Sequence, residues 1–154
     1  MIHRAYIGIG SNLGDPTANV TAAIAALAAI GKVAKTSSLY RTKPWGVEDQ
    51  PDYVNAVVLL KTTLPPRILL AALKSIEVDL GRTSAERWAA RIIDLDILTY
   101  DKIEIAEEGL NIPHKHMNER AFVLVPLAEI DAAFVPAYKT LSEAVRAEVR
   151  LLSD

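Results

Sequence analysis

The order of strand-like and helix-like segments constrains this chain more than any other feature. Short apolar runs with strand character alternate with two segments whose apolar residues recur every three or four positions, the spacing of an amphipathic helix. From the N-terminus, the predicted order is strand, helix, strand, strand, helix, strand. This order predicts two helices that cover one face of a largely antiparallel sheet.

Residues that begin and end helices bound the two predicted helices. Asp15 as N-cap and Pro16 as first helical residue predict the start of the first helix, and Gly31 predicts its end. The second helix opens at the prolines of 65–66 and ends at Gly81, where a left-handed cap is expected. Its apolar stripe consists of Leu69, Leu73, Ile76 and Leu80.

The predicted strands cover residues 6–9, 33–42, 53–62 and 92–100, and a hairpin follows over 103–112. Thr140 and Glu143 predict a capping box for a last helix. The buried side of that helix is expected to comprise Leu141, Val145, Val149 and Leu152. The predicted fold class is α+β, a ferredoxin-like βαββαβ core in a layered sandwich with an added C-terminal helix, in one domain over residues 1–154.

Charge and composition exclude several classes of protein. A net charge of -2 and a pI of about 5.9 provide no long-range attraction to nucleic acid or anionic lipid, which argues against an RNA-binding ferredoxin-like module. The absence of cysteine excludes disulfides, thiolate nucleophiles and cysteine-based zinc sites. No apolar run is long enough to span a bilayer, and the N-terminus lacks a signal core. We therefore expect a cytoplasmic monomer with neither a nucleic-acid nor a membrane partner.

Two carboxylates interrupt the apolar run RIIDLDILTY. Asp94 and Asp96 are two residues apart, so in a strand both side chains lie on one face, with Cα atoms roughly 6.5 Å apart. Adjacent like charges on an apolar strand are costly to desolvate unless a cation compensates them. The pair predicts a Mg²⁺ site, although a solvent-facing side of an amphipathic strand is the alternative for an arbitrary D-x-D.

Four arginines lie near this pair in the sequence: Arg82, Arg87, Arg91 and Arg120. Carboxylates with guanidinium groups suit a triphosphate, because a metal bridges phosphate oxygens while the arginines neutralise the charge that develops during transfer. The two common nucleotide motifs fail, since Leu13 stands at the third glycine position of G-x-G-x-x-G and no G-K-[ST] loop exists.

Six ordered blocks of sequence resemble the 6-hydroxymethyl-7,8-dihydropterin pyrophosphokinase family. They are GSNLGD (10–15), SSLYRTKPWG (37–46), DQPDYVNAV (49–57), LGR (80–82), ERWAARIIDLDIL (86–98) and IPHKHMNERAFVLVPL (112–127). The resemblance implies an ATP-dependent diphosphotransferase of folate biosynthesis. Such an enzyme transfers pyrophosphate from ATP to the hydroxymethyl group of the pterin and releases AMP.

The resemblance also implies a role for each site residue. Asp94 and Asp96 bind Mg²⁺, two ions in all, with Arg82, Arg91 and Asp96 as the catalytic residues. The residues that contact ATP, the co-substrate, are Arg82, Arg87, Arg91, Ile97, His114 and Arg120. The residues that contact the pterin are Thr42, Pro44, Trp45, Gly46, Tyr53, Asn55 and Phe122. Tyr53 and Phe122 are expected to stack on its rings, and Asn55 to form hydrogen bonds with its amide-like edge.

Two alternatives to this function stay open on the sequence. One is another Mg²⁺-dependent phosphotransferase that uses the same DLD site on a different small alcohol. The other is a noncatalytic homologue that only binds nucleotide, against which the retention of both aspartates and of Arg82 and Arg91 argues.

Overall fold

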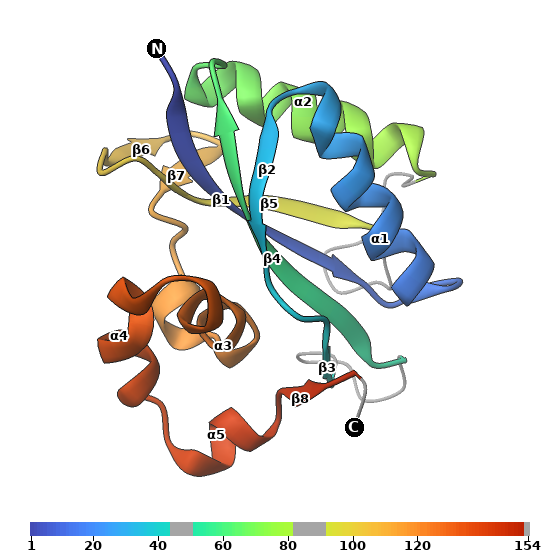
Figure 1. Ribbon diagram of the computed structural model, residues 1–154, viewed down its shortest axis with the longest axis vertical. Coiled ribbons are helices and arrows are strands. Elements are labelled where there is room, and N and C mark those ends of the chain that lie inside the picture. Colours follow the sequence, from blue (N-terminus) through green and yellow to red (C-terminus); the bar gives the residue numbers. More distant parts are fainter. Residues whose placement is uncertain (44–50, 82–91, 153–154) are drawn as a thin grey trace.

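The predicted order of strands and helices is present in the structure, a computed structural model that describes residues 1–43, 51–81 and 92–152 (Figure 1). The core elements are β1 (His3–Ser11), α1 (Pro16–Ala26), β2 (Lys32–Thr36), β3 (Tyr40–Thr42), β4 (Tyr53–Thr62), α2 (Pro66–Asp79) and β5 (Asp94–Tyr100). The strand order is β5-β1-β4-β3-β8, where β8 is Arg150–Leu151 near the C-terminus, with β2 also paired to β4, and every one of these pairings between described strands is antiparallel. The α+β, ferredoxin-like fold class is therefore confirmed.

The remaining elements follow β5. They are β6 (Ile105–Glu107), β7 (Leu110–Ile112), α3 (Ala121–Ile130), α4 (Val135–Lys139), α5 (Glu143–Ala147) and β8 (Arg150–Leu151), with 3₁₀ turns at Leu27–Ala29, Met117–Glu119 and Ala132–Phe134. The β6–β7 pair is the predicted hairpin. No helix in the described part of the chain is both long and apolar enough to cross a bilayer, and the cytoplasmic location stays a prediction.

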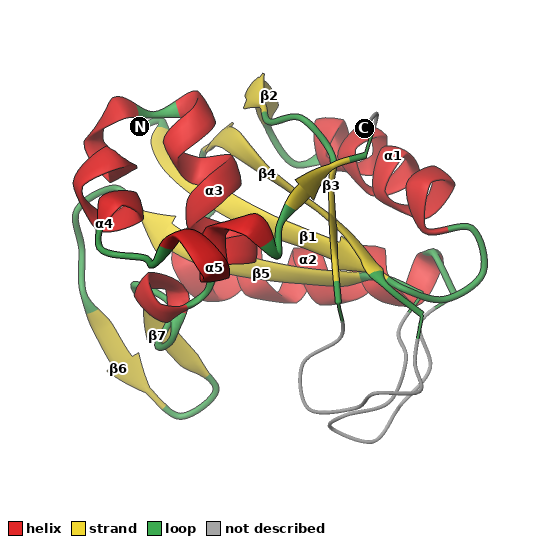
Figure 2. Ribbon diagram, turned by 90° about the horizontal axis from the view of Figure 1, so that it is seen from below, coloured by secondary structure: helices red, strands yellow, loops and turns green. Residues whose placement is uncertain are grey.

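The two faces of the sheet carry different cores, because successive side chains of a strand point to opposite faces. Ile7 of β1, Val58 of β4 and Leu95 of β5 lie in the larger core, with Leu69 and Leu73 of α2. The opposite face holds a smaller core that comprises Tyr6, Val57, Leu59, Leu98, Met117, Val123, Leu124 and Leu127. Helices α1 and α2 thus cover one face and α3 the other, as Figure 2 shows with α3 and α5 in front of the strands and α2 behind them.

The predicted starts of the first two helices and the end of the second are confirmed, whereas α1 ends at Ala26 and a 3₁₀ turn over Leu27–Ala29 separates it from Gly31, its predicted end. The Asp15 side chain caps α1 by accepting a hydrogen bond from the N–H of Ala18 (3.2 Å), and Pro16 is its first residue. After α2, Gly81 has a φ of +103°, the left-handed region in which glycine ends a helix without the steric cost of a Cβ.

The single strand predicted over 33–42 is wrong, because the structure has two strands there with a break between them. At the break, the Ser37 hydroxyl accepts a hydrogen bond from the N–H of Val57 (2.9 Å). The backbone N–H of Ser38, the residue after Ser37, donates to the Glu129 carboxylate of α3 (2.9 Å). Side chains far away in the sequence therefore satisfy backbone groups that would otherwise belong to a continuous ladder.

The predicted last helix is also wrong in its start and length. Ser142, not Thr140, caps α5 by accepting from the N–H of Val145 (3.2 Å), because the Thr140 hydroxyl donates to the Ala137 carbonyl (2.6 Å) instead. The helix ends at Ala147, and β8 then pairs with β3. The four residues expected on its buried side, Leu141, Val145, Val149 and Leu152, are half-buried.

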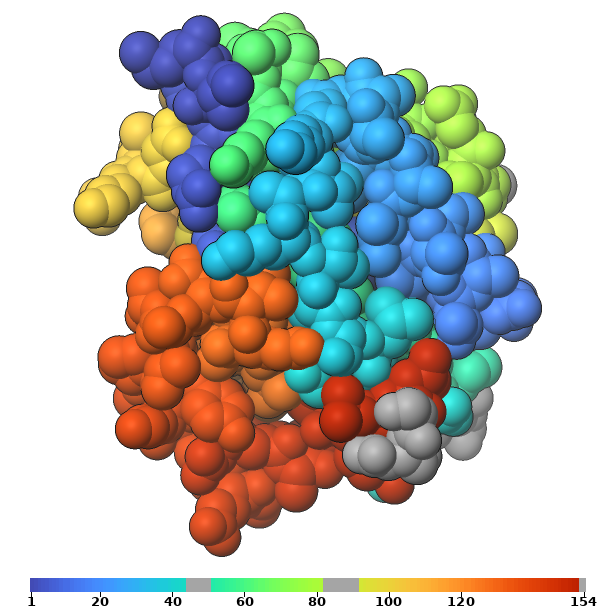
Figure 3. All heavy atoms as spheres, in the orientation of Figure 1, coloured from blue at the N-terminus to red at the C-terminus, as the bar shows by residue number. Residues whose placement is uncertain are grey.

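Helix α3 is not among the predicted elements, although it closes the smaller core. It contains Pro126 in its interior and is apolar on most sides, so no helical stripe marks it. The C-terminal segment that α3 begins, orange to red in Figure 3, forms a continuous block beside the first two thirds of the chain. Just after α3, the Tyr6 hydroxyl donates to the Asp131 carboxylate (2.6 Å), which ties the helix to β1.

The Tyr6–Asp131 hydrogen bond makes a pH-dependent contribution to stability. Burial and this hydrogen bond raise the pKa of Tyr6 to about 12, and the Tyr6 hydroxyl is the main cause that lowers the pKa of Asp131. A lowered carboxyl pKa stabilises the fold above the unfolded value of about 3.9, and this contribution is lost as the pH falls through the folded value.

We expect Tyr6→Phe to lower the free energy of unfolding by about 1 kcal/mol at pH 7, since it removes the hydroxyl and keeps the ring on Phe134. The difference from the unmodified protein should begin to shrink below about pH 4 and should vanish once the pH has fallen through the lowered pKa of Asp131. Urea unfolding from pH 7 down to about pH 2.5 measures both values. A difference that stays constant over this range would contradict the assignment.

Candidate active site

Two glycines of β1 lie between the acidic strand β5 and β4 on the sheet face that bears α3. Gly10 pairs with Asp94 of β5 on one side and with Asn55 of β4 on the other, and Gly8 pairs with Asp96 and Val57 in the same way. Residues directly opposite in an antiparallel sheet share a face, so the Asp94 and Asn55 side chains flank a position that carries none. Two strand spacings separate their backbones by about 10 Å.

Asp94 and Asp96 lie on one face, as the D-x-D spacing predicts. Both side chains are half-buried, while Ile93, Leu95 and Ile97 are buried in the core on the other face. Burial, the charge of Asp94 and the charge of Glu77 raise the pKa of Asp96 to about 7. Two adjacent carboxylates that resist joint ionisation favour a cation between them.

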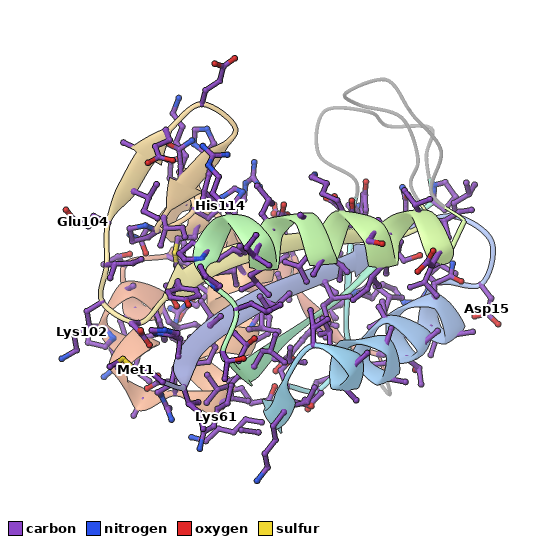
Figure 4. All side chains as sticks on the ribbon, turned by 90° about the horizontal axis from the view of Figure 1, so that it is seen from above. Met1, Asp15, Lys61, Lys102, Glu104 and His114 are labelled. Carbon is purple, nitrogen blue, oxygen red and sulfur yellow. The ribbon has the colours of Figure 1, made fainter. Side chains whose placement is uncertain are left out.

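His114 and Arg120 reach this pair from the segment between β7 and α3. Figure 4 shows His114 beside the β6–β7 hairpin, where its N–H donates to the Leu98 carbonyl of β5 (2.8 Å). Burial and then the charges of Arg120 and His116 lower the pKa of His114, against the opposing effect of Asp94. Arg120 in turn acts to lower the pKa of Asp96. The structure therefore brings these four predicted residues within electrostatic reach of one another.

Asn55 and Thr42 lie on the other side of Gly10 from the acidic strand. The Asn55 amide nitrogen donates to the Thr42 hydroxyl (2.7 Å), and both residues are buried. A Cβ on Gly10 would lie only 2.8 Å from the Asn55 amide oxygen, and 3.6 Å from the ring of Tyr53. The glycine is therefore needed for this side-chain arrangement, which leaves an amide and an aromatic ring next to the acidic strand.

Phe122 of α3 lies on the same side of the sheet. Its ring is half-buried against the smaller core, and the Arg120 guanidinium carbon lies 5.6 Å from the ring centroid. Through this cation–π contact, Phe122 is connected to the residues around Asp96. Tyr53 and Phe122 thus share a face of the sheet, as a stacking pair requires.

Several predicted site residues fall outside the described ranges: Pro44, Trp45, Gly46, Arg82, Arg87 and Arg91. Ile97 is described, and its side chain is buried on the opposite face at 4% exposure. A contact between Ile97 and ATP would therefore involve the backbone of Ile97. Backbone groups along an antiparallel strand point alternately toward and away from the neighbouring strand, so those of Ile97, like those of Leu95, point away from β1.

Glu77 of α2 is a residue of this region that the sequence did not single out. It is 2% exposed, and its carboxylate accepts a hydrogen bond from the N–H of Leu95, between the two aspartates (2.7 Å). In the sequence, Glu77 is a charged residue on the apolar stripe of α2, four positions after Leu73. A carboxylate at a buried helix position needs a hydrogen-bond or ionic partner, so this position could have predicted such a contact.

The donor set of the site suits a hard cation that retains other ligands. In the ranges 1–43, 51–81 and 92–152, no group of three or more His, Asp or Glu side chains gathers closely enough to hold a metal ion by itself. Asp94 and Asp96 provide two carboxylates on one face, and Mg²⁺ usually takes one or two protein carboxylates together with water and substrate phosphates. The residues present therefore fit Mg²⁺.

Comparison with known proteins gives a consistent result. The family model for 7,8-dihydro-6-hydroxymethylpterin-pyrophosphokinase matches residues 6–132. A protein of Methylorubrum extorquens is 46% identical over 144 residues, 92% of this chain and 91% of its own length. A protein of Haemophilus influenzae is 45% identical over 145 residues, again 92% and 91% of the two chains. Both carry the name 2-amino-4-hydroxy-6-hydroxymethyldihydropteridine pyrophosphokinase.

Solved structures support the fold. A crystal structure of Plasmodium falciparum HPPK-DHPS superposes with a TM-score of 0.72 at 15% sequence identity, over 91% of this chain and 45% of that longer chain. At this identity the likeness concerns the fold alone. From the family model and the two bacterial relatives, this chain belongs to the 7,8-dihydro-6-hydroxymethylpterin-pyrophosphokinase family.

Proposed function

We infer that this chain transfers the pyrophosphoryl group of ATP to the hydroxymethyl oxygen of 6-hydroxymethyl-7,8-dihydropterin and releases AMP, a step of folate biosynthesis. Membership of the family over residues 6–132 supports the reaction. In the structure, the observation that supports it is the pairing of Gly10 with Asp94 of the acidic strand on one side and with Asn55 of the strand that begins at Tyr53 on the other. The proposed phosphate site and the proposed heterocycle site would therefore adjoin on one face of the sheet.

The transfer requires the hydroxymethyl oxygen to form a bond with the β-phosphorus while the bond from that phosphorus to the α,β-bridging oxygen breaks. The bridging oxygen leaves with AMP, and the hydroxyl proton is lost from the attacking oxygen. Mg²⁺, two ions in this proposal, would be held by Asp94 and Asp96 and would neutralise charge on the phosphate oxygens. Positioning the two reactants in line is the main task of the protein.

On the phosphate side, we assign contacts with ATP to His114 and Arg120, because both lie within electrostatic reach of the aspartates. We assign the remaining phosphate contacts to Arg82, Arg87 and Arg91, and a nucleotide contact to the Ile97 backbone. Arg82, Arg91 and Asp96 are the proposed catalytic residues. Guanidinium groups that engage the phosphates during transfer stabilise the charge that develops there.

On the pterin side, Asn55 offers a donor and an acceptor to the polar edge of the heterocycle, and its amide is oriented by Thr42. Tyr53 and Phe122 provide aromatic faces for the flat ring, a type of contact that adds on the order of 1 kcal/mol beyond burial. Pro44, Trp45 and Gly46 complete the proposed pterin site. We also propose that the chain acts as a single domain and a monomer.

Product analysis separates this reaction from that of another Mg²⁺-dependent phosphotransferase. We expect incubation with ATP, Mg²⁺ and 6-hydroxymethyl-7,8-dihydropterin to yield AMP in amounts equal to the pterin diphosphate, resolved by ion-exchange chromatography. Omission of the pterin should abolish AMP formation. Formation of ADP alone would assign the chain to ordinary kinases.

Asp96→Ala and Asp96→Asn should both reduce kcat by on the order of 10³-fold, because the charge that holds the metal is lost. Loss of folding would not explain this result. The folded pKa of Asp96, about 7, lies above its ordinary value of 3.8, so the ionised carboxylate destabilises the metal-free protein at higher pH. Asp96→Asn should therefore be at least as stable as the unmodified protein at pH 8 without Mg²⁺. AMP formation at the unmodified rate in either variant would refute the role of Asp96.

Gly10→Ala should raise the KM for the pterin about tenfold or more and change the KM for ATP much less. The new Cβ would meet the Asn55 amide oxygen at 2.8 Å, so the amide must move and its hydrogen bond to Thr42 is disturbed. Steady-state kinetics with each substrate varied in turn measures the two constants. Equal effects on both would argue against the placement of the pterin next to Asn55.

A further inference from the structure

The carboxylate of Glu77 occupies a place that apolar packing does not explain. Its neighbours on the buried stripe of α2, Leu73 and Ile76, are aliphatic, yet Glu77 is as buried as they are. A buried carboxylate is costly to desolvate and persists only with partners. One partner is the N–H of Leu95 at 2.7 Å, and the Lys74 ammonium lies 3.9 Å from the other carboxylate oxygen.

The position of the Leu95 N–H explains why a partner is needed there. Strand β5 is at the edge of the sheet, paired with β1 on one side. Successive backbone N–H groups of an antiparallel strand point to opposite sides, so the N–H groups of Asp94 and Asp96 point toward β1 and the N–H of Leu95 points away from it. The Glu77 carboxylate accepts the hydrogen bond of this outward N–H, which lies between the two aspartates in the chain.

The hydrogen bond also joins two segments that lie close together only in the fold. Helix α2 ends at Asp79 and β5 begins at Asp94. Near these ends, a Cβ on Gly81 would lie 3.6 Å from the Cδ1 of Ile92, so the residues just after the helix and just before the strand lie close together. The Glu77–Leu95 bond joins the helix to the strand at the residue between the two aspartates.

We propose that Glu77 is a positioning residue for pyrophosphoryl transfer: by accepting the Leu95 N–H, it holds the backbone between Asp94 and Asp96 so that both carboxylates address one site. This inference rests on the proposed function. Misplacement of a reacting group by about 1 Å can cost on the order of 100-fold in rate, and metal ligands require similar accuracy. An edge strand without this anchor has no other strand to hold its outer side.

Three variants separate this role from a general contribution to stability. Glu77→Gln keeps an acceptor oxygen at the same length and removes the charge. Glu77→Met keeps the volume and removes the acceptor. Ile76→Val is the matched control, since it shortens the neighbouring residue of the same buried stripe without removing a polar group, and such a change typically lowers stability only moderately.

For each folded variant, the measurements are kcat for AMP formation, the Mg²⁺ concentration for half-maximal rate, and the hydrogen-exchange rate of the Leu95 amide by NMR. We expect Glu77→Met to lower kcat roughly 10- to 100-fold, to raise the Mg²⁺ requirement and to speed exchange at Leu95. Glu77→Gln should keep the amide protected, with kcat within about threefold of the unmodified protein. Ile76→Val should change none of the three readouts.

Three results would overturn the proposal. The first is a kcat for Glu77→Met equal to that of Ile76→Val, and the second is a Leu95 amide that stays protected from exchange in Glu77→Met. The third is a kcat for Glu77→Gln as low as that for Glu77→Met, because the effect would then come from the lost charge. Each is distinct from failure of the proposed function, which would appear in the unmodified protein as an absence of AMP.

Discussion

The antiparallel pairing of β1 with β4 on one side and β5 on the other is the interaction on which the rest of the structure depends. This pairing aligns Gly10 with Asp94 and Asn55, and thereby fixes how far the acidic strand lies from the amide and aromatic strand. Because the central strand has no side chain at Gly8 and Gly10, neighbouring side chains approach its backbone closely: an added Cβ would lie 3.3 Å from Leu98 at Gly8 and 2.8 Å from Asn55 at Gly10. A shift of one residue in the register of β5 on β1 would send Asp94 and Asp96 to the apolar face, at a large desolvation cost, and the same shift of β4 would send Asn55 there.

The candidate site gathers carboxylates from two adjacent elements, with Asp94 and Asp96 on β5 and the buried Glu77 on α2. Burial, the charge of Asp94 and the charge of Glu77 raise the pKa of Asp96 to about 7. The ionised carboxylate of Asp96 therefore lowers the stability of the metal-free protein at higher pH, and the divalent cation of the proposed function would offset this cost. The net charge of the whole chain, -2, plays no part in this local effect.

Local patterns predicted much of the fold because their causes are local. Asp15, Pro16 and Gly81 act within a few residues, and the alternation of Asp94 and Asp96 with aliphatic residues specifies a strand face without knowledge of its neighbours. The failures share a different cause. The break between β2 and β3 depends on Glu129, and α3 is stabilised by burial against the sheet despite its internal Pro126. These interactions join residues far apart in the chain.

The sequence by itself determined the alternation of the first strands and helices, the shared face of the two aspartates and, through six ordered blocks, the family. The tertiary structure alone decided that Gly10 lies between Asp94 and Asn55, that Asn55 is oriented by Thr42, and that Glu77 accepts a hydrogen bond from the acidic strand. The physical reason is that spacing along a chain sets only the direction of a side chain on its own element. Which atoms then meet depends on strand register and on helix packing, and both are settled by contacts between distant segments.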